Sequence, residues 1–499
     1  MIKYTLKEKL IRYIDAGFPI IYINSFEEDK SDKIIKEAIY GREILEWNKF
    51  DGYIDFKTRV QQIGEDFSLE AILGILKRDN ELERKVLVLK DINAFIDDIN
   101  IISQLKGIAK NINNGLESNI IMVSSTVNIP KELEKYITVL EMDYLTSEEI
   151  SEIIKEFVSA NSLPELNKRF LEEMSIALKG LSEFEINNIL ALAYADDGEL
   201  TRKDLSLIFD QKQQMIKKAG ILEMIPLKET VDDIGGLENL KIWLSRKAKI
   251  FKNINKAHEF GVDMPKGVLI AGVPGCGKSL NAKAAANLFE VPLLRLDMGR
   301  LMGKYLGESE ANMRKAISLA EAISPCVLWI DELEKAFSGI GGEGSGAEVT
   351  TRLLGSFLTW MQEKESSVFV VATANDITKL PPELLRKGRF DEIFYVGLPN
   401  EKERKKIFEI HIKKRRKADL PNINIDKLVS ETKGYSGADI EGVIKESIEI
   451  TFAEDKDSLT TEEISKVISN THSLSEIMKE PLEKMSKEYE NRKFKNASK

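Results

Sequence analysis

The sequence predicts an α/β fold in which a parallel sheet with flanking helices occurs twice along the chain. Short apolar runs rich in β-forming residues alternate with helical stretches, which is typical of parallel strands joined by crossover helices. Residues 272–279 match the phosphate loop pattern Gly-x4-Gly-Lys-Ser/Thr. Residues 179–190 in the first half parallel residues 433–444 in the second. These observations predict two related nucleotide-binding architectures, of which the second carries the phosphate loop.

Length and composition indicate a globular protein of several domains. The length of 499 residues exceeds that of one ordinary domain. Hydrophobic residues make up 43% of the chain, as in globular proteins. No apolar run approaches the ~18 residues that cross a bilayer, and the N-terminus lacks a signal-peptide core. Two cysteines give no disulfide framework, and three histidines without a CxxC pair argue against a metal site of those residues. We therefore expect a cytosolic protein without a membrane partner. The net charge of −10 argues against nucleic acid as its principal partner.

The first half contains three clear strand candidates. They are short and apolar, as buried parallel strands are, and comprise residues 19–24, 85–89 and 119–124. The strand ending at Asp91 takes the place of 327–331 in the second half, and the third strand takes the place of 368–373. This correspondence supports a duplicated architecture, although a coincidental α/β domain is the alternative.

The first copy lacks the residues that bind phosphate. Its first strand is followed by residues 25–30, which contain no glycine and carry carboxylates where phosphates would lie. Asp91 is followed by Ile92 rather than by a glutamate. We therefore expect that the first copy does not bind ATP in the usual way.

The phosphate loop of the second half lies between a strand-like run, 268–271, and an alanine-rich helical run, 280–286. Its glycines let backbone N–H groups turn toward phosphate oxygens at the positive end of the following helix. Lys278 would reach the β and γ phosphates, and the Ser279 hydroxyl would hold Mg²⁺. Cys276 is expected to fill space, with oxidation-sensitive ATP binding as the alternative. The expected nucleotide contacts here are Gly272, Val273, Pro274, Gly275, Cys276, Gly277, Lys278, Ser279 and Leu280.

Two further strand ends carry polar residues that suit ATP hydrolysis. Asp331 follows a buried strand at the sheet edge where α/β proteins bind ligands, and it would hold Mg²⁺ through water. Glu332 would take the proton of the water that attacks the γ-phosphate. Asn375 follows the strand 368–372 and would orient the same water.

The order and spacing of these motifs resemble the AAA ATPases over roughly residues 230–475. The motifs are 232–237, the phosphate loop, 327–332, 373–375, 386–391 and 434–439. Within that superfamily, residues 358–364 and 381–392 look most like the hypothetical-chloroplast-reading-frame AAA proteins of algal plastids and cyanobacteria. The resemblance implies an AAA large subdomain (230–398) and a helical lid (399–475), preceded by a degenerate AAA-like domain without a phosphate loop (1–210) and a linker (211–229). The charged tail (476–499) is expected to be a frayed helix or a disordered arm.

The resemblance also gives a role to two arginines that have no obvious partner within one catalytic site. Cleavage at the γ-phosphate needs cationic charge, and in AAA proteins the arginines that match Arg386 and Arg389 reach into the neighbouring subunit's site. This implies a homo-oligomeric ring, with a hexamer favoured, although Lys387 stands where family members usually have proline. The backbone of Gly437 and Ala438 would contact adenine, and Asp233, Ile234 and Gly235 would cover the base from the other side.

In AAA motors the position of Lys304, Tyr305 and Leu306 is an axial pore loop, in which an aromatic side chain grips a polypeptide. Tyr305 therefore suggests pulling on a protein substrate, while local packing of a loop tyrosine is the alternative. The glycine-rich segment 339–346 is expected to be a second pore loop or a surface linker.

The sequence thus predicts a Mg²⁺-dependent ATPase that assembles into a ring and remodels or threads a protein substrate, with an adaptor as a further partner. A slow ATP-dependent switch or regulatory binding protein is the competing class. A fused metalloprotease is disfavoured because His258-Glu259 lacks a second histidine at the required spacing.

Overall fold

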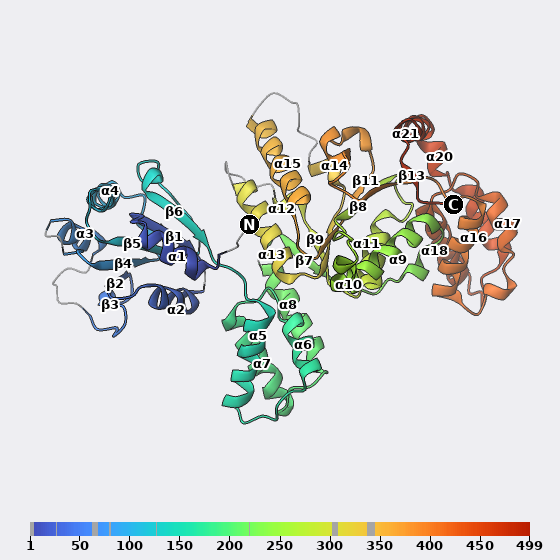
Figure 1. The fold of residues 1–499 in the computed structure, drawn as a ribbon. Helices are drawn as coiled ribbons and strands as arrows, with labels where there is room; N and C mark the ends of the chain where they lie inside the picture. Colours follow the sequence, from blue (N-terminus) through green and yellow to red (C-terminus); the bar gives the residue numbers. More distant parts are fainter. Residues whose placement is uncertain are drawn as a thin grey trace. The chain divides into compact units, whose positions relative to one another are not determined.

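The computed structural model of the protein describes residues 4–25, 27–61, 68–78, 81–125, 127–218, 220–301, 308–336 and 345–499. The chain divides into two compact units, Met1–Arg202 and Lys203–Lys499. Each unit contains one mainly parallel sheet with helices on its faces (Figure 1). In these described ranges, no helix is both long and apolar enough to cross a membrane.

The sheet of the first unit has the strand order β3-β2-β4-β5-β1-β6, and the pairs are parallel except β2 with β3. Its central strands read as continuous apolar runs because helices cover both faces. The three strands predicted for this half fall on β1, β4 and β5. The strands are β1 (Ile20–Asn24), β2 (Glu43–Asn48), β3 (Gly52–Asp55), β4 (Lys85–Lys90), β5 (Asn119–Ser124) and β6 (Ile137–Glu141).

Two helices cover each face of this sheet. α1 and α2 pack on one face, where Leu10 and Ile35 meet Ile21, and α3 and α4 cover the other face. The later helices α5, α6 and α7 pack on one another. The helices are α1 (Leu6–Asp15), α2 (Glu28–Ala38), α3 (Leu69–Arg78), η1 (Ile92–Ala94), α4 (Ile99–Asn113), η2 (Glu134–Tyr136), α5 (Ser147–Ala160), α6 (Lys168–Ala177) and α7 (Glu183–Asp197).

The sheet of the second unit has the strand order β13-β12-β8-β11-β10-β9-β7, with β7 antiparallel to β9. The phosphate loop follows β8, which lies between β12 and β11. The strands are β7 (Leu222–Ile225), β8 (Gly267–Gly272), β9 (Leu293–Leu296), β10 (Cys326–Ile330), β11 (Val368–Ala374), β12 (Glu392–Val396) and β13 (Lys495–Asn496).

Helices α9 and α11 pack on one face of this sheet through a common apolar cluster. Helix α13 packs on α15 and on β10. The helices around the sheet are α8 (Asp204–Lys218), η3 (Val231–Asp233), α9 (Glu238–Lys252), α10 (Ile254–Glu259), α11 (Lys278–Phe289), α12 (Met298–Leu301), α13 (Glu308–Ile323), α14 (Leu333–Ala336), α15 (Ser345–Glu363), η4 (Ile377–Lys379) and η5 (Pro382–Leu385).

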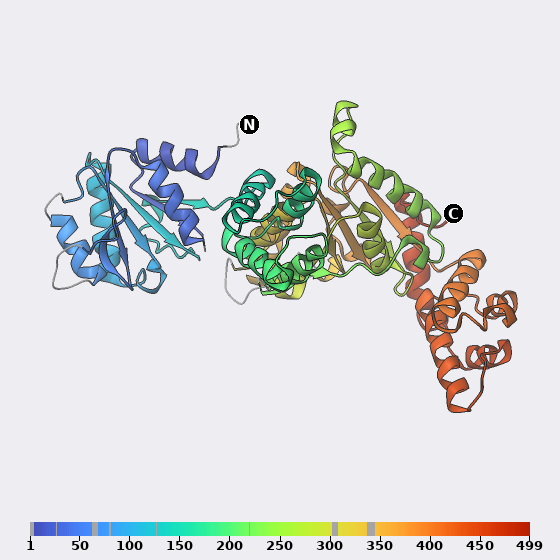
Figure 2. The same cartoon turned by 90° about the horizontal axis from the view of Figure 1, so that it is seen from below.

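The lid forms its own apolar core from the helices that follow β12. Figure 2 shows these helices, in orange and red, gathered at one end of the unit. They are α16 (Glu401–Arg416), η6 (Leu420–Asn422), α17 (Ile425–Glu431), α18 (Gly437–Ala453) and α19 (Thr461–Asn470), and α20 (Leu474–Ile477) and α21 (Lys479–Arg492) follow.

The two sheets share one topology, as the predicted duplication requires. The order β6-β1-β5-β4-β2 in the first unit corresponds to β12-β8-β11-β10-β9 in the second. In both sheets an antiparallel strand pairs with the outermost of these parallel strands. The paralleled stretches also match, since α7 and α18 both begin with a serine-based capping box, at Ser182 and Ser436. A coincidental resemblance does not account for this shared strand order.

Two segments differ from the sequence-based expectations. The expected linker 211–229 contains the end of α8 and the edge strand β7, because alternate residues of 222–225 are buried against the sheet. The expected frayed or disordered tail forms α21 and β13, which pairs with β12. The tail is anchored because Tyr489 stacks on Tyr395, with 4.1 Å between ring centroids, and Ala497 is buried in the core.

Candidate functional site

The phosphate loop contains three glycines in backbone conformations that other residues rarely adopt. Gly272, Gly275 and Gly277 have φ values of 144°, 75° and 84°, in the region that disfavours side chains. A Cβ added at Gly272 would lie 2.1 Å from the carbonyl oxygen of Val396 on β12. The loop therefore lies close to the neighbouring strand and leads directly into α11, whose N-terminus favours anions.

Lys278, the first residue of α11, is buried at the loop. Its Nζ donates hydrogen bonds to the carbonyl oxygens of Gly272 at 2.9 Å and Val273 at 2.7 Å. Burial lowers the pKa of Lys278 to about 8, and nearby carboxylates partly oppose that effect. The ammonium is thus held inside the loop, where phosphate oxygens would replace carbonyl partners.

Asp331 and Ser279 meet beside the loop. The Ser279 hydroxyl donates to Asp331 Oδ1 at 3.2 Å. Thr373, a buried residue of β11, also donates to Asp331 Oδ1, and its Oγ1 accepts the Glu332 N–H at 3.1 Å. The sequence analysis placed Thr373 in the motif 373–375 but assigned it no role, although its place two residues before Asn375 could have suggested one.

Glu332 lies at a strained turn, with φ of 52°. Its Oε1 accepts the Asn375 side-chain amide at 3.1 Å, and its Oε2 forms an ion pair with Lys335 Nζ at 2.6 Å. Thr373 therefore holds the backbone of Glu332, and the Asn375 side chain holds its carboxylate, at the carboxyl edge of the sheet.

Glu334 is a second residue that the sequence reasoning missed. It is buried, and its Oε1 accepts the backbone N–H of Asn375 at 3.0 Å. Burial raises the pKa of this carboxyl, and the Asn375 N–H opposes that effect. Glu334 therefore ties α14 to the end of β11 and positions Asn375.

The lid contacts the phosphate loop through the start of α18. The Ala438 N–H donates to the Gly275 carbonyl at 2.9 Å, and a Cβ on Gly437 would lie 3.1 Å from the same oxygen. Gly235 lies against α16, since an added Cβ would meet Ile407 at 2.4 Å. Ile234 is buried, and Asp233 accepts the Thr230 N–H at 2.8 Å. The segments expected on either side of the base are therefore both packed at the junction of lid and sheet.

Cys276 and Leu280 pack partly buried against the core beneath the loop. Burial raises the pKa of the Cys276 thiol to about 11, which leaves little thiolate at neutral pH. This agrees with the space-filling role predicted for Cys276.

The structure does not bring the arginines to these side chains. Arg386 is exposed, and among the described residues its guanidinium makes neither an ion pair nor a hydrogen bond. Arg389 is half-buried, with a buried Nε that lacks a hydrogen-bond partner within the same ranges. The predicted pore-loop residues Lys304, Tyr305 and Leu306, and most of 339–346, lie outside the described residues.

The corresponding edge of the first unit has different residues. Only residues 25–27 separate β1 from α2, so the long phosphate loop is missing there. Pairing register and the shared left-handed turn, at Asp91 and Glu332, align Lys90 with Asp331. The expectation that Asp91 matches Asp331 is therefore wrong by one residue, because the turn and not the acidic side chain marks the equivalent position.

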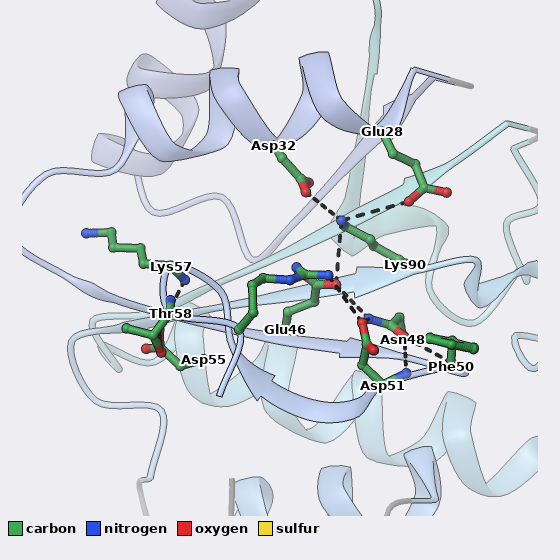
Figure 3. A network of polar contacts seen from close by, with 11 residues as sticks. Glu28, Asp32, Glu46, Asn48, Phe50, Asp51, Asp55, Lys57, Thr58 and Lys90 are labelled. Atoms are coloured by element: carbon green, nitrogen blue, oxygen red, sulfur yellow. Dashed lines mark hydrogen bonds and ion pairs between the residues drawn. The ribbon is translucent and has the colours of Figure 1, made fainter. Parts of the chain in front are cut away.

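At this edge of the first unit, Lys90 forms ion pairs with carboxylates of the same unit (Figure 3). Its Nζ lies 2.7 Å from Asp32 Oδ2, 3.5 Å from Glu46 Oε1 and 4.0 Å from Glu28 Oε2. Asp32 and Glu28 belong to α2, the helix that corresponds to α11. Carboxylates thus occupy the helix and an ammonium the strand end, which is the reverse of the second unit.

A glycine loop between β8 and α11, an acidic pair at the end of β10 and a helical lid define an ATPase of the AAA class. Residues 268–398 match the ATPase family associated with various cellular activities (AAA), and 422–466 match the AAA+ lid domain. Residues 6–142 and 148–219 match the N-terminal and second domains of SpoVK-like AAA ATPases. The chain belongs to the AAA ATPase family, within the group of the ycf46 proteins.

That grouping rests on similarity along nearly the whole chain. The "Uncharacterized AAA domain-containing protein ycf46" of Guillardia theta is 40% identical over 457 residues, covering 90% of this chain and 88% of the relative. The protein of the same name from Pyropia yezoensis is 37% identical over 95% of each chain. The "Cell division cycle protein 48 homolog" of Archaeoglobus fulgidus is 30% identical over 68% of this chain and 46% of its own length.

Thr373→Val should impair hydrolysis without loss of fold, because valine keeps the volume and removes the hydroxyl that orients Asp331 and Glu332. We expect kcat and apparent Mg²⁺ affinity each to fall about 10- to 100-fold, as for other residues that orient metal ligands. Steady-state ATPase assays across Mg²⁺ concentrations measure both. Thr373→Ser is the matched control and should stay close to wild type. Unchanged Mg²⁺ dependence in the valine variant would show that Thr373 does not position Asp331.

ATP affinity should fall as the pH rises above about 8. The lowered pKa of Lys278 means that its amine begins to lose its proton there, whereas bound phosphates favour the ammonium and raise that pKa. Binding therefore takes up a proton above about pH 8, and affinity should drop by up to about tenfold per pH unit, while it stays level below that pH. Titration with a fluorescent ATP analogue measures this. Lys278→Arg keeps its charge and should show no such decline, and a level wild-type affinity up to about pH 9.5 would contradict the prediction.

Proposed function

We propose that this protein is a Mg²⁺-dependent ATPase that works as a ring and uses hydrolysis to remodel or thread a protein substrate. The proposal is carried by one observation: Lys278, Ser279, Asp331, Glu332 and Asn375 converge at the carboxyl edge of one sheet, beside the phosphate loop. A site that only bound nucleotide would need the loop and lysine but not a fixed glutamate.

The residues at this edge fit ATP with Mg²⁺. Backbone N–H groups of the loop and the Lys278 ammonium would bind the phosphates. Ser279 would hold Mg²⁺ directly and Asp331 through water, which suits an ion that prefers oxygen ligands and keeps several waters. Within the described ranges, no cluster of three or more His, Cys, Asp or Glu could hold a metal by itself, so substrate phosphates would complete the coordination. Bound Mg²⁺ would offset negative charge on the phosphate oxygens.

Glu332 is the proposed base. A water oxygen attacks the γ-phosphorus while its proton passes to the Glu332 carboxylate, and the bond from that phosphorus to the bridging oxygen of ADP breaks. Asn375, which already donates to Glu332, would orient the water through the same amide. Release of Glu332 from Lys335 would free one carboxylate oxygen for the proton.

Arg386 supports a shared site. Transition-state charge at the γ-phosphate calls for a cation beyond Lys278. Arg386 is exposed and has no partner in the described part of its own chain, so we propose that it completes the site of a neighbouring subunit. Arg389 is the second candidate. By the family resemblance we favour a hexameric ring, with adenine held between Asp233–Gly235 and Gly437–Ala438.

A mixing experiment tests hydrolysis and the shared site together. We expect ATPase activity per chain to rise with assembly, followed by light scattering, and Glu332→Gln to bind ATP without hydrolysing it. Arg386→Ala should lose about a thousandfold or more in kcat.

Mixing these two variants should restore activity, because a Glu332→Gln subunit can supply its arginine to a site with an intact glutamate. Lys278→Ala is the control that cannot bind ATP. Concentration-independent activity of a monomer, or no recovery on mixing, would contradict the ring.

The slow regulatory switch is the second candidate, and Tyr305 separates the two. If the protein pulls on a polypeptide, Tyr305→Ala should abolish ATP-dependent unfolding of a tagged fluorescent protein while ATPase activity stays near wild type. Tyr305→Phe keeps the ring and should retain unfolding. Unfolding that survives the alanine substitution would reject Tyr305 as the gripping residue, whereas a wild-type chain that binds ATP but unfolds nothing would favour the switch.

A further inference from the structure

The start of α9 has no cap from its own side chains. α9 begins at Glu238, just after the segment 233–235, and its N-cap residue Leu237 offers no side-chain hydrogen bond to the first turn. Leu237 also has a φ of 57°, which is an unfavourable conformation for a residue other than glycine. Such a conformation persists where the surrounding structure holds it. Contacts from other parts of the chain therefore fix this turn.

Glu403, on the lid helix α16, makes one of these contacts. The residue is 5% exposed, and its Oε1 accepts the Leu237 N–H at 2.9 Å. Its Oε2 accepts the Asn400 N–H at 3.0 Å, while Asn400 Oδ1 accepts the Glu403 N–H, which forms a capping box. A buried carboxylate is stable when its oxygens are satisfied in this way. The start of α16 thus fixes the direction of the carboxylate that holds Leu237.

Two glycines let α16 approach the segment before α9. A Cβ added to Gly236, where φ is 87°, would lie 2.4 Å from Glu403 Cγ. One turn further along α16, Ile407 lies against Gly235, as described above. Ile407 also approaches the other lid segment, since a Cβ on Gly437 would lie 3.8 Å from its Cδ1. One helix therefore contacts both segments that are expected to flank the base.

Other contacts at this junction are weaker or lie further along α9. Lys406 pairs with Glu238 at 2.6 Å, but the lysine side chain is half exposed, and exposed ion pairs contribute little. The Ala497 carbonyl accepts two N–H groups of the first turn of α9, at 3.0 and 3.3 Å, both beyond Leu237. The bond from Glu403 is thus a buried tie between the lid and the backbone that directly follows 233–236.

We propose that Glu403 is a positioning residue for the nucleotide base. Through the Leu237 backbone it would keep the segment 233–235 in place against the base, while the phosphates are bound separately by the loop and Lys278. Affinity for the base then depends on this carboxylate, whereas affinity for the phosphates does not. The inference rests on the proposed function, since it takes adenine to lie between 233–235 and 437–438.

Comparing ligands with and without a base tests this role. Displacement of a fluorescent ATP analogue from the full chain, in Mg²⁺, gives Kd for ATP and for inorganic tripolyphosphate, which has the phosphates alone. Glu403→Ala should raise Kd for ATP about tenfold, as expected for loss of a hydrogen bond to a charged group, and leave Kd for tripolyphosphate within about twofold. Glu403→Gln keeps the size but has one oxygen for two N–H groups, so it should raise Kd for ATP about threefold.

Lys406→Gln is the matched control, because it removes the exposed ion pair of the same junction and should leave both Kd values within about twofold of wild type. Equal rises for ATP and tripolyphosphate in Glu403→Ala would indicate a general loss of structure and overturn the proposal. The glutamine variant decides the question where the alanine variant does not fold. A wild-type preference for ATP that both Glu403 variants keep would reject this inference alone. A wild-type chain that binds tripolyphosphate as tightly as ATP would reject the adenine placement of the proposed function, and this inference with it.

Discussion

The catalytic unit depends on the junction between the ends of β10 and β11. The hydroxyl of Thr373, a buried residue, donates to the Asp331 carboxylate and accepts the backbone N–H of Glu332, so it orients Asp331 and holds the backbone that carries Glu332. Parallel strands bring these groups to one edge, where the positive end of α11 and the Lys278 ammonium balance their charge. Without this balance, two carboxylates beside a buried loop would be costly, and the edge could not be held ready for a trianionic phosphate group.

The first unit shows how the same topology carries different residues at the corresponding edge of its sheet. At the position of Asp331 it has Lys90, and at the position of Arg295 on the second parallel strand it has Glu46. At the first unit's edge Lys90 pairs with carboxylates of its own chain, whereas the second unit's edge carries Asp331 and Glu332 beside the phosphate loop. The fold therefore does not decide function here, and the residues at the strand ends do.

The lid and the C-terminal segment join the large subdomain partly through backbone contacts, beside side-chain contacts such as the stacking of Tyr489 on Tyr395. Ala438 reaches the loop through its N–H, and the tail adds β13 beside β12 while Ala497 accepts from Asn239 and Leu240 at the start of α9. Such contacts constrain size and backbone geometry but leave little trace in residue chemistry. This is why the phosphate loop could be predicted from sequence, whereas β7 and β13 were expected as a linker and a disordered arm.

The sequence alone determined the α/β class, the repeated architecture, the central strands and the positions that would handle phosphate. These follow from local patterns, because strand periodicity, glycine spacing and capping residues act over a few neighbours. Only the tertiary structure decided that Thr373 bonds to Asp331 and to the Glu332 N–H, that Glu334 accepts the Asn375 N–H, and that Lys90 rather than Asp91 matches Asp331. These contacts join residues distant in the chain, and register between strands, which sequence spacing does not encode, brings them together.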